Sequence, residues 1–433
     1  MIIHKFGGSH LISKDTFENF YQILSSTEGN SVVVISALGK TTRRLLEAAQ
    51  NAENGHFDKA ISIKDKLLSF TSTLSDSVIE HEELKRISQE EIEEFFGQIA
   101  KYLKNIHVLR ELTPRIQDAL LSFGERIALK LFSRFCEAKG LKFAEVDAGD
   151  IIITNENFTQ ANPLQEIISE NINSKILPFL EKYPIILTQG FIGKTMKNDY
   201  STMGFESSNM TALLFAKYLD AHEITIWTDV EGIFNVDPNI WTKAEQLPEL
   251  SFTEAEKAAQ FGNKLIYPKM IRRAAKNNMK ITYKSVLNPE GRATVIHPHF
   301  YTKSKMITIT NNISFLRVDL TEQNEINSRI FSRIMSPGDN FKFVSRFNDF
   351  AEIFTDDAKV ENLLQENSIP HQDYTCITLI NEDILNLYKV IVNYSDLFLN
   401  LDYKLYPVDE GTYHLFIRSS ENKDLTAILN AIN

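Results

Sequence analysis

A glycine-containing segment near the N-terminus has the residue types needed to hold phosphate groups. The residues Lys5-Phe6-Gly7-Gly8-Ser9 come directly after the apolar run at positions 1–3. A strand that ends in this way places a lysine ammonium beside a loop of bare backbone N–H groups, and both attract the negative charge of phosphates. The segment therefore predicts a nucleotide site that uses Lys5 and the amides of the loop.

Other polar residues could take part in phosphoryl transfer. Gly39-Lys40-Thr41 is similar to the end of a P-loop, but the first glycine of that motif would fall at Val34, so this interpretation fails. Ser36 follows a strand-like run, where its hydroxyl could face a ligand or cap a helix. Taken by itself, Glu125 is expected to be a solvated carboxylate on a helix. Asp229, just beyond another strand-like run, is either a turn residue or a site residue.

The elements that position these residues alternate between strands and helices. Strand-like runs occur at positions 31–35, 142–146, 185–187 and 223–227. This alternation favours an α/β fold with a largely parallel sheet. Apolar residues at helical spacing predict a helix over 115–138. The charged stretch 56–112 predicts helices that cover the edge of the sheet.

The pattern changes near Phe300, where Pro298 closes a strand and a new alternating run begins at 306–310. Further strands are predicted at 315–319, 375–380, 388–392 and 412–417, and a helix at 424–432. The sequence therefore predicts one domain over 1–300 and one or two small α+β modules over 301–433.

Composition limits the classes of protein. The 433 residues are 43% hydrophobic and 24% charged, as expected of a globular protein with two or three domains. The formal net charge of −11 argues against a nucleic-acid partner, because phosphate backbones require clustered Lys and Arg. The chain has neither a basic leader nor about 18 consecutive apolar residues, so we expect a cytoplasmic protein without a membrane partner. Cys136 and Cys376 are expected to be buried thiols.

Six segments, in their order along the chain, resemble those of aspartokinases within the amino-acid kinase superfamily, and the resemblance covers about residues 1–296. The segments are Lys5-Phe6-Gly7-Gly8-Ser9, Ser36-Ala37-Leu38-Gly39-Lys40-Thr41-Thr42, Leu112-Thr113-Pro114-Arg115 with Ser122-Phe123-Gly124-Glu125, Thr188-Gln189-Gly190-Phe191-Ile192-Gly193, Trp227-Thr228-Asp229-Val230-Glu231-Gly232-Ile233, and Phe261-Gly262-Asn263-Lys264. The resemblance implies a three-layer α/β sandwich followed by ACT-like modules. It also implies ATP-dependent phosphorylation of the β-carboxylate of L-aspartate to 4-phospho-L-aspartate, the first step of lysine, threonine and methionine biosynthesis.

The resemblance also implies a role for each site residue. Lys5 and Lys264 would be the catalytic cations that neutralise the moving phosphoryl group. The implied substrate-binding residues are Ser36, Glu125, Phe191, Ser208 and Asn209, with Glu125 receiving the amino group of the substrate. The implied nucleotide-binding residues are Gly7, Gly8, Ser9, Thr228, Asp229, Phe234, Asp237 and Lys264. ATP with Mg²⁺, a homodimer formed through the ACT-like region, and feedback by lysine or threonine complete the expectation.

One segment departs from the family. Aspartokinases have a pattern that resembles Thr-Thr-Leu-Gly-Arg-Gly-Gly-Ser-Asp-Tyr-Thr, whereas this chain reads Ser201-Thr202-Met203-Gly204-Phe205-Glu206-Ser207-Ser208-Asn209-Met210-Thr211. The family's arginine pairs with a substrate carboxylate through a bidentate fork, which Phe205 lacks. Losing one charge-assisted pair costs roughly 1.5–3 kcal/mol. The candidate cations for its replacement from other loops are Arg272, Arg273 and Lys197.

Three functions are compatible with this pattern. The first is an aspartokinase, which the retained lysines and glycine loop favour. The second is an amino-acid kinase with another acceptor, because Phe205 and Glu206 suit a substrate that lacks this carboxylate or bears a cation. The third is a catalytically weak homologue that regulates. Turnover distinguishes the third from the first, whereas nucleotide binding does not.

Overall fold

The computed structural model describes residues 1–8, 10–204, 207–263, 265–297, 304–321, 325–335, 341–367, 369, 371–399, 401–419 and 425–432. The chain forms two compact units. The first comprises residues 1–233 and 269–298, and the second comprises 234–268 and 299–433. Along the chain the units change after residues 233, 268 and 298, and the expected boundary near Phe300 is close to the last of these positions. The segment 234–268, however, groups with the C-terminal residues. The division into domains 1–300 and 301–433 stays a prediction.

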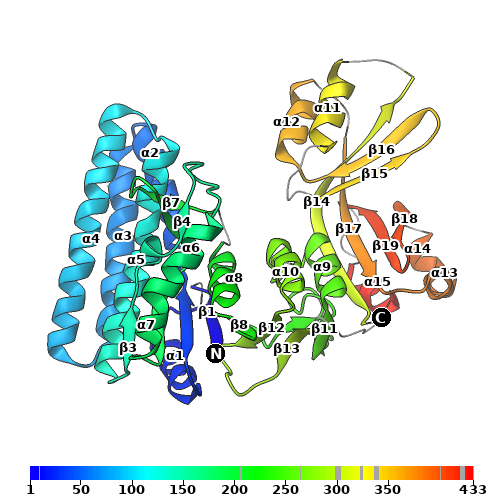
Figure 1. Cartoon of the computed structure of the whole chain (residues 1–433). Helices are drawn as coiled ribbons and strands as arrows, with labels where there is room; N and C mark the ends of the chain where they lie inside the picture. The colour runs from blue at the N-terminus through cyan, green and yellow to red at the C-terminus, as the bar shows by residue number, and fades with distance from the viewer. Residues whose placement is uncertain are drawn as a thin grey trace. The chain divides into compact units, whose positions relative to one another are not determined.

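The first unit is built on a largely parallel sheet, as predicted (Figure 1). Its strands are β1 (Ile2–Phe6), β2 (Ser31–Ile35), β3 (Phe143–Glu145), β5 (Ile185–Gln189), β8 (Glu223–Thr228), β12 (Lys280–Ser285) and β13 (Ala293–His297). They lie in the order β13-β12-β8-β1-β2-β5-β3, and only the β12–β13 pair among them is antiparallel. A smaller sheet contains β4 (Ile153–Thr154), β6 (Ile192–Thr195) and β7 (Tyr200–Thr202).

The register of the parallel strands brings their carboxyl ends to one edge. Phe6 at the end of β1 lies opposite Ile35 of β2 and Trp227 of β8. Ile35 in turn lies opposite Gln189, the last residue of β5. Residues that follow these strands are far apart in sequence but therefore meet at this edge, which is where ligands bind in open α/β sheets.

The helices of the first unit are α1 (Lys14–Ser26), α2 (Thr41–Glu53), α3 (Phe57–Val78), α4 (Glu82–Leu109), α5 (Pro114–Ala138), α6 (Gln165–Asn171), α7 (Leu177–Leu180), α8 (Ser208–Tyr218) and α10 (Pro268–Lys276). Thr113 caps α5 by accepting the Ile116 N–H at 3.3 Å, and Pro114 occupies its first turn, which explains the start of the predicted helix. Residues 57–109 form helices as predicted. However, α3 and α4 run side by side and pack on α2 and α5, not on the edge of the sheet (Figure 1).

Aromatic packing holds α1 and α5 to the sheet. The rings of Phe17 on α1 and Phe132 on α5 stack in parallel with centroids 4.3 Å apart. Phe20 contacts both Phe132 and Phe6 of β1. These side chains are fully buried, and each contributes about 1.5–3 kcal/mol of hydrophobic stabilisation. The packing fixes α5, which carries Glu125, relative to the strand ends.

The second unit contains a six-stranded sheet in the order β15-β16-β14-β17-β19-β18. Its strands are β14 (Met306–Asp319), β15 (Lys342–Arg346), β16 (Phe350–Thr355), β17 (Gln372–Ile380), β18 (Tyr403–Asp409) and β19 (Thr412–Arg418). Its helices are α9 (Phe252–Gln260), α11 (Glu325–Met335), α12 (Ala358–Glu366), α13 (Ile384–Asn393), α14 (Ser395–Phe398) and α15 (Leu425–Ile432). The short strands are β10 (Gln246–Leu247), which pairs with β9 (Ile233–Phe234), and β11 (Glu249–Ser251).

Two predictions for the second unit need correction. The predicted strand 388–392 is wrong, because these residues lie in α13, where Asp383 caps the helix by accepting the Leu385 N–H at 2.9 Å. The runs 306–310 and 315–319 were expected as separate strands, but both belong to β14, which continues through a register shift between Thr310 and Ile313. Both Cys136 and Cys376 are buried free thiols, as predicted.

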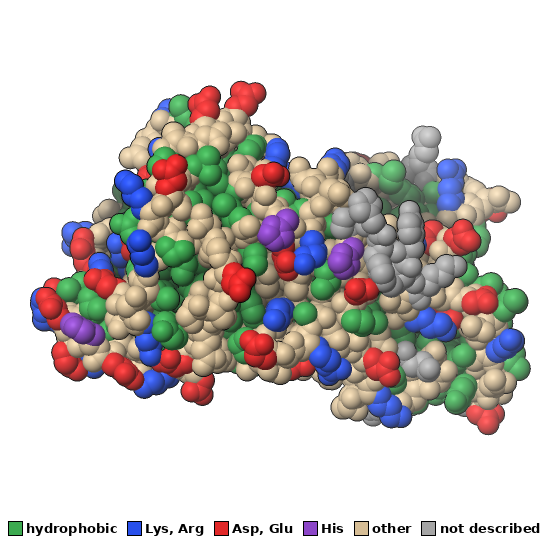
Figure 2. Space-filling view, turned by 60° about the horizontal axis from the view of Figure 1, so that its bottom comes forward, with side chains coloured by type: hydrophobic (Ala, Val, Ile, Leu, Met, Phe, Trp, Pro, Cys, Tyr) green, Lys and Arg blue, Asp and Glu red, His purple; other side chains and the backbone are tan. Residues whose placement is uncertain are grey.

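The surface shows no segregation of charge where it is drawn. Acidic and basic side chains are interspersed on the face of the molecule in Figure 2. Among the helices that the structure describes, none is both long and apolar enough to cross a membrane.

Candidate functional site

The glycine loop after β1 is pinned between two neighbouring strand ends. The Gly7 N–H donates to the Trp227 carbonyl at 3.2 Å, and the Gly8 carbonyl accepts the Gly39 N–H at 2.8 Å. A Cβ atom added to Gly7 would lie 3.8 Å from Lys5 Nζ, so the ammonium extends along the loop. Lys5 Nζ therefore lies close to Gly7, and its use of the loop amides stays a prediction. Ser9 lies outside the described residues.

Glu125 is the buried carboxylate of this edge. Its exposed fraction is only 4%, although it carries a charge when ionised. Oε1 accepts two long hydrogen bonds of 3.4 Å, one from the Ala37 N–H beyond β2 and one from the Thr42 hydroxyl on α2. Within the described part of the chain Oε2 has no hydrogen-bond partner. Glu125 is therefore not a solvated surface residue, and one of its oxygens is available to a ligand.

Burial raises the pKa of Glu125 to about 8. An unfolded chain ionises this group near its ordinary value of 4.5, whereas the folded protein keeps the proton up to about pH 8. Between these two pH values the unfolded state has released a proton that the folded state retains, so Glu125 lowers the stability as the pH rises.

We expect Glu125→Gln to remove this pH dependence. The free energy of unfolding of the wild type should fall, relative to that of the variant, by on the order of 4 kcal/mol between pH 5 and pH 8, and then level off. Urea unfolding at pH steps between 5 and 9 measures the difference. Glu166→Gln, at an exposed position on α6, is the control and should follow the wild type. Parallel curves for wild type and Glu125→Gln would show that Glu125 is ionised throughout.

The start of α8 approaches the end of β5 closely. The Gly190 N–H donates to the Ile35 carbonyl at 2.8 Å, and a Cβ atom on Gly190 would lie 2.5 Å from Ser208 Cβ. Only glycine allows this approach, which places Ser208 and Asn209 at the same edge as Ser36. Asn209 is buried, and its Oδ1 has no partner in the described part of the chain. The unpaired N–H groups at a helix N-terminus also favour an anion.

Phe191 links this turn to the segment that departs from the family. Its backbone is in the left-handed region at φ 66°, an uncommon conformation for a bulky residue. Its carbonyl accepts the Met203 N–H at 3.1 Å and the Ser207 hydroxyl at 3.5 Å. Phe205 and Glu206 lie outside the described residues.

The nucleotide-side residues divide between the two units. Thr228 ends β8, and its hydroxyl donates to the Val230 carbonyl at 3.0 Å. Asp229 forms an ion pair with His10 at 3.2 Å when the imidazole is protonated. Phe234 and Asp237 belong to the second unit, where Asp237 Oδ1 accepts the Asn239 N–H at 2.9 Å. Lys264 lies outside the described residues.

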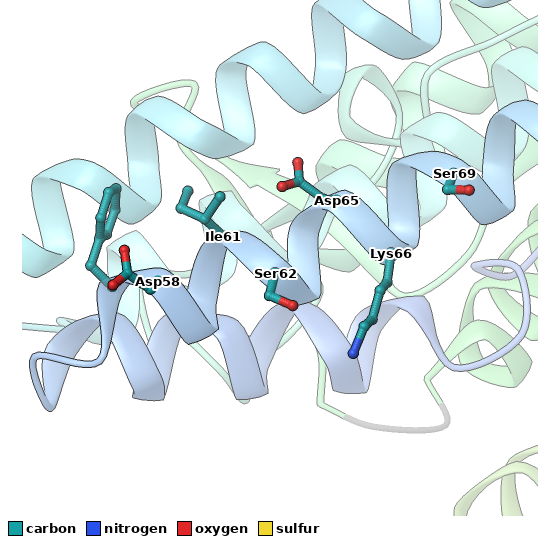
Figure 3. Close-up of a pocket in the computed structure, with 7 residues that line it drawn as sticks. Asp58, Ile61, Ser62, Asp65, Lys66 and Ser69 are labelled. Atoms are coloured by element: carbon teal, nitrogen blue, oxygen red, sulfur yellow. The ribbon is translucent and has the colours of Figure 1, made fainter.

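A groove of about 550 Å³ occurs elsewhere, on the outer side of α3 (Figure 3). It is lined by Phe57, Asp58, Ile61, Ser62, Asp65, Lys66 and Ser69. These residues follow one side of a single helix, whereas the predicted site residues follow strand ends. The groove is therefore separate from the candidate site.

Three residues that contact the site or its supports were not identified from the sequence, namely His10, Thr42 and Asp118. Asp118 had a detectable signal, because it precedes Glu125 by seven residues and such positions lie on the same side of a helix. Thr42 lies in the segment 36–42 that resembles the family, but the sequence assigned it no role. His10 gave no signal, and both contacts depend on how the loops fold.

Comparison with known proteins agrees with this geometry. Residues 1–283 match the model of the amino acid kinase family, and the chain belongs to that family. Its sequence is similar to aspartokinases: it is 32% identical to aspartokinase 2, chloroplastic, of Arabidopsis thaliana over 297 residues, which are 68% of this chain and 54% of that protein. It is 29% identical to lysine-sensitive aspartokinase 3 of Escherichia coli over 302 residues, which are 68% of this chain and 64% of that protein.

Solved structures show the same fold. Escherichia coli aspartokinase III in complex with lysine and aspartate has a TM-score of 0.80 at 21% identity, with 100% of this chain and 98% of that chain covered. The same enzyme in complex with aspartate and ADP has a TM-score of 0.78. The chain spans about half the length of the Arabidopsis relatives that it matches.

Proposed function

We propose that this chain is an ATP-dependent kinase that phosphorylates the β-carboxylate of L-aspartate. The observation that carries the proposal is Glu125, a buried carboxylate with an unpartnered oxygen at the edge where the glycine loop lies. A substrate ammonium would complete its hydrogen bonds and favour its ionised form. The aspartokinases among the relatives, and the aspartate and ADP bound in the E. coli structures, support this assignment of the two ligands.

The proposed roles follow from charge. Lys5 neutralises negative charge on the phosphoryl group as it moves, and the Gly7 and Gly8 backbone holds the phosphates. Ser36, Ser208 and Asn209 orient the acceptor, so that its carboxylate attacks in line. Mg²⁺ bound with ATP would neutralise part of the charge of the phosphates, and Asp229 is the carboxylate at this edge that would hold it. Phe234, Asp237 and Lys264 complete the proposed nucleotide side.

Aspartyl phosphate reacts with hydroxylamine, which makes the proposal directly testable. Purified protein with ATP, Mg²⁺, L-aspartate and hydroxylamine should form aspartyl hydroxamate, and omission of either ATP or aspartate should abolish it. Absence of hydroxamate at saturating aspartate would exclude aspartate as the acceptor. Other amino acids would then be tested in the same assay, and a regulatory role would follow if none reacts.

Arg273 is the cation best placed to replace the arginine missing at Phe205. Its Nη1 lies 2.7 Å from Met210 Sδ in the first turn of α8, beside Asn209. Lys197, by contrast, is paired with Glu156 at 2.9 Å. In the hydroxamate assay, Arg273→Met should raise the KM for aspartate about 10- to 100-fold and leave the KM for ATP nearly unchanged. Arg44→Met, which breaks an exposed pair with Glu47, is the control. An equal rise in both KM values would exclude this role.

We also propose that the second unit is an ACT-like regulatory region. Its sheet carries two separate hydrophobic clusters, one around Leu415 and Ile428 and the other around Ile330 and Ile353, as two modules require. Feedback by an amino acid and dimerisation through this region follow from the family resemblance. Lysine and threonine are the effectors to test.

A further inference from the structure

Asp118 is a fully buried carboxylate on α5 without a cationic partner among the described residues. Its two oxygens instead accept three short hydrogen bonds from two loops that are distant in sequence. Oδ2 accepts the backbone N–H groups of Thr159 and Thr202, both at 2.8 Å. Oδ1 accepts the Thr202 hydroxyl at 2.7 Å. Burying a carboxylate is costly unless such bonds satisfy it, so the arrangement requires an explanation.

Both chain segments that Asp118 holds lie at the start of the stretch 201–211, which departs from the family and which we call the acceptor segment. Thr202 ends β7, two residues before Gly204. Thr159 has its backbone in the left-handed region at φ 71°, and its carbonyl lies 3.6 Å from the position of a Cβ atom on Gly204. Gly204, itself at φ 88°, accepts the Ser207 N–H at 3.3 Å just before α8 begins. Asp118 therefore holds both Thr202, which ends the strand before Gly204, and Thr159, whose carbonyl lies beside Gly204.

We propose that Asp118 is a positioning residue for the amino-acid acceptor, an inference that rests on the proposed function. The same helix carries Glu125, which would receive the amine of the acceptor. Through α5, Asp118 sets the acceptor segment at a fixed place relative to Glu125. Lys5 lies in β1 and the glycine loop follows that strand. Neither depends on the Asp118 contacts, so the effect should fall on the acceptor and not on the nucleotide.

Three variants test the proposal. Asp118→Ala should raise the KM for aspartate by about 10-fold or more, because small displacements of a binding group have large effects, while the KM for ATP stays within about 2-fold. Asp118→Asn should act as a rescue, because its oxygen can accept both N–H groups while its NH₂ donates to the Thr202 hydroxyl. Thr202→Val removes one of the three bonds and should give an intermediate KM. Arg86→Met, which breaks an exposed pair with Glu90 on α4, is the control and should behave as the wild type.

Hydrogen exchange separates this proposal from the proposed function. Asp118→Ala should speed amide exchange in residues 155–162 and 200–204, whichever acceptor the protein uses. An inactive wild type with this exchange pattern would contradict the aspartate assignment and support the positioning role, whereas unchanged exchange in both ranges would overturn the positioning role. Equal rises in both KM values, or an Asn variant as impaired as the Ala variant, would overturn the positioning role. If Asp118→Ala does not fold, Thr202→Val supplies the same KM comparison.

Discussion

Replacing Lys5 with alanine should lower kcat for ATP-dependent hydroxamate formation by about 1,000-fold. Lys5 lies in β1 between Val34 of β2 and Ile226 of β8, so the strand register fixes its backbone. Its ammonium lies beside the glycine loop, and under the proposed function it would neutralise the charge that the transferred phosphoryl group gains in the transition state. Rates at saturating ATP and aspartate measure the change.

The control for this variant is Lys59→Ala, at an exposed position on α3, which should leave kcat unchanged. Nucleotide binding should persist in Lys5→Ala, because the loop amides remain. A kcat within about 3-fold of the wild type would show that another group stabilises the transition state.

Gly8→Ala should impair both nucleotide binding and stability. The added Cβ would lie 1.7 Å from the Ala37 carbonyl oxygen and 2.6 Å from its carbon, and backbone cannot yield as a flexible side chain does. The loop must therefore move away from the end of β2. We expect kcat/KM for ATP to fall about 100-fold, and the free energy of unfolding to fall by about 1–3 kcal/mol.

Gly97→Ala is the matched control for Gly8→Ala. Gly97 lies within α4 and has open space around the position of its Cβ atom. Alanine there should stabilise the protein by about 0.5–1 kcal/mol and leave activity unchanged. Steady-state kinetics and urea unfolding on both variants measure the two effects. Wild-type kinetics in Gly8→Ala would contradict the tight approach of the loop to Ala37.

Local sequence patterns predicted the first unit better than the second. The strand at residues 31–35 was predictable from its apolar run. The helix over 115–138 was predictable because its apolar periodicity, a capping threonine and a proline agree locally. The error at 388–392 arose because that run is apolar on nearly all positions, so its period does not distinguish a strand from a helix. The continuity of β14 depends on pairing with β16 and β17, which no local pattern contains.

The candidate site was predictable where its residues lie in short, continuous sequence motifs. The glycine loop, Ser36 and Glu125 could be named because their motifs are short and continuous. Asp118 and Arg273 act on segments 84 and 63 residues away, and only the folded chain shows these contacts. The burial of Glu125, and hence its raised pKa, also depends on the packing of α2 and α5.

The continuous helix α5 fixes the spacing between two parts of the proposed acceptor site. Asp118 and Glu125 are seven residues apart, so the helical rise separates them by about 10 Å along one side of a rigid rod. This helix holds two groups at a fixed spacing: Glu125, the carboxylate proposed to bind the amine, and Asp118, which holds the acceptor segment. Inserting one residue between them would rotate Asp118 by about 100° around the helix axis relative to Glu125. The spacing between Glu125 and the contacts of Asp118 is thus set by a helical rise, which varies far less than the length of a loop.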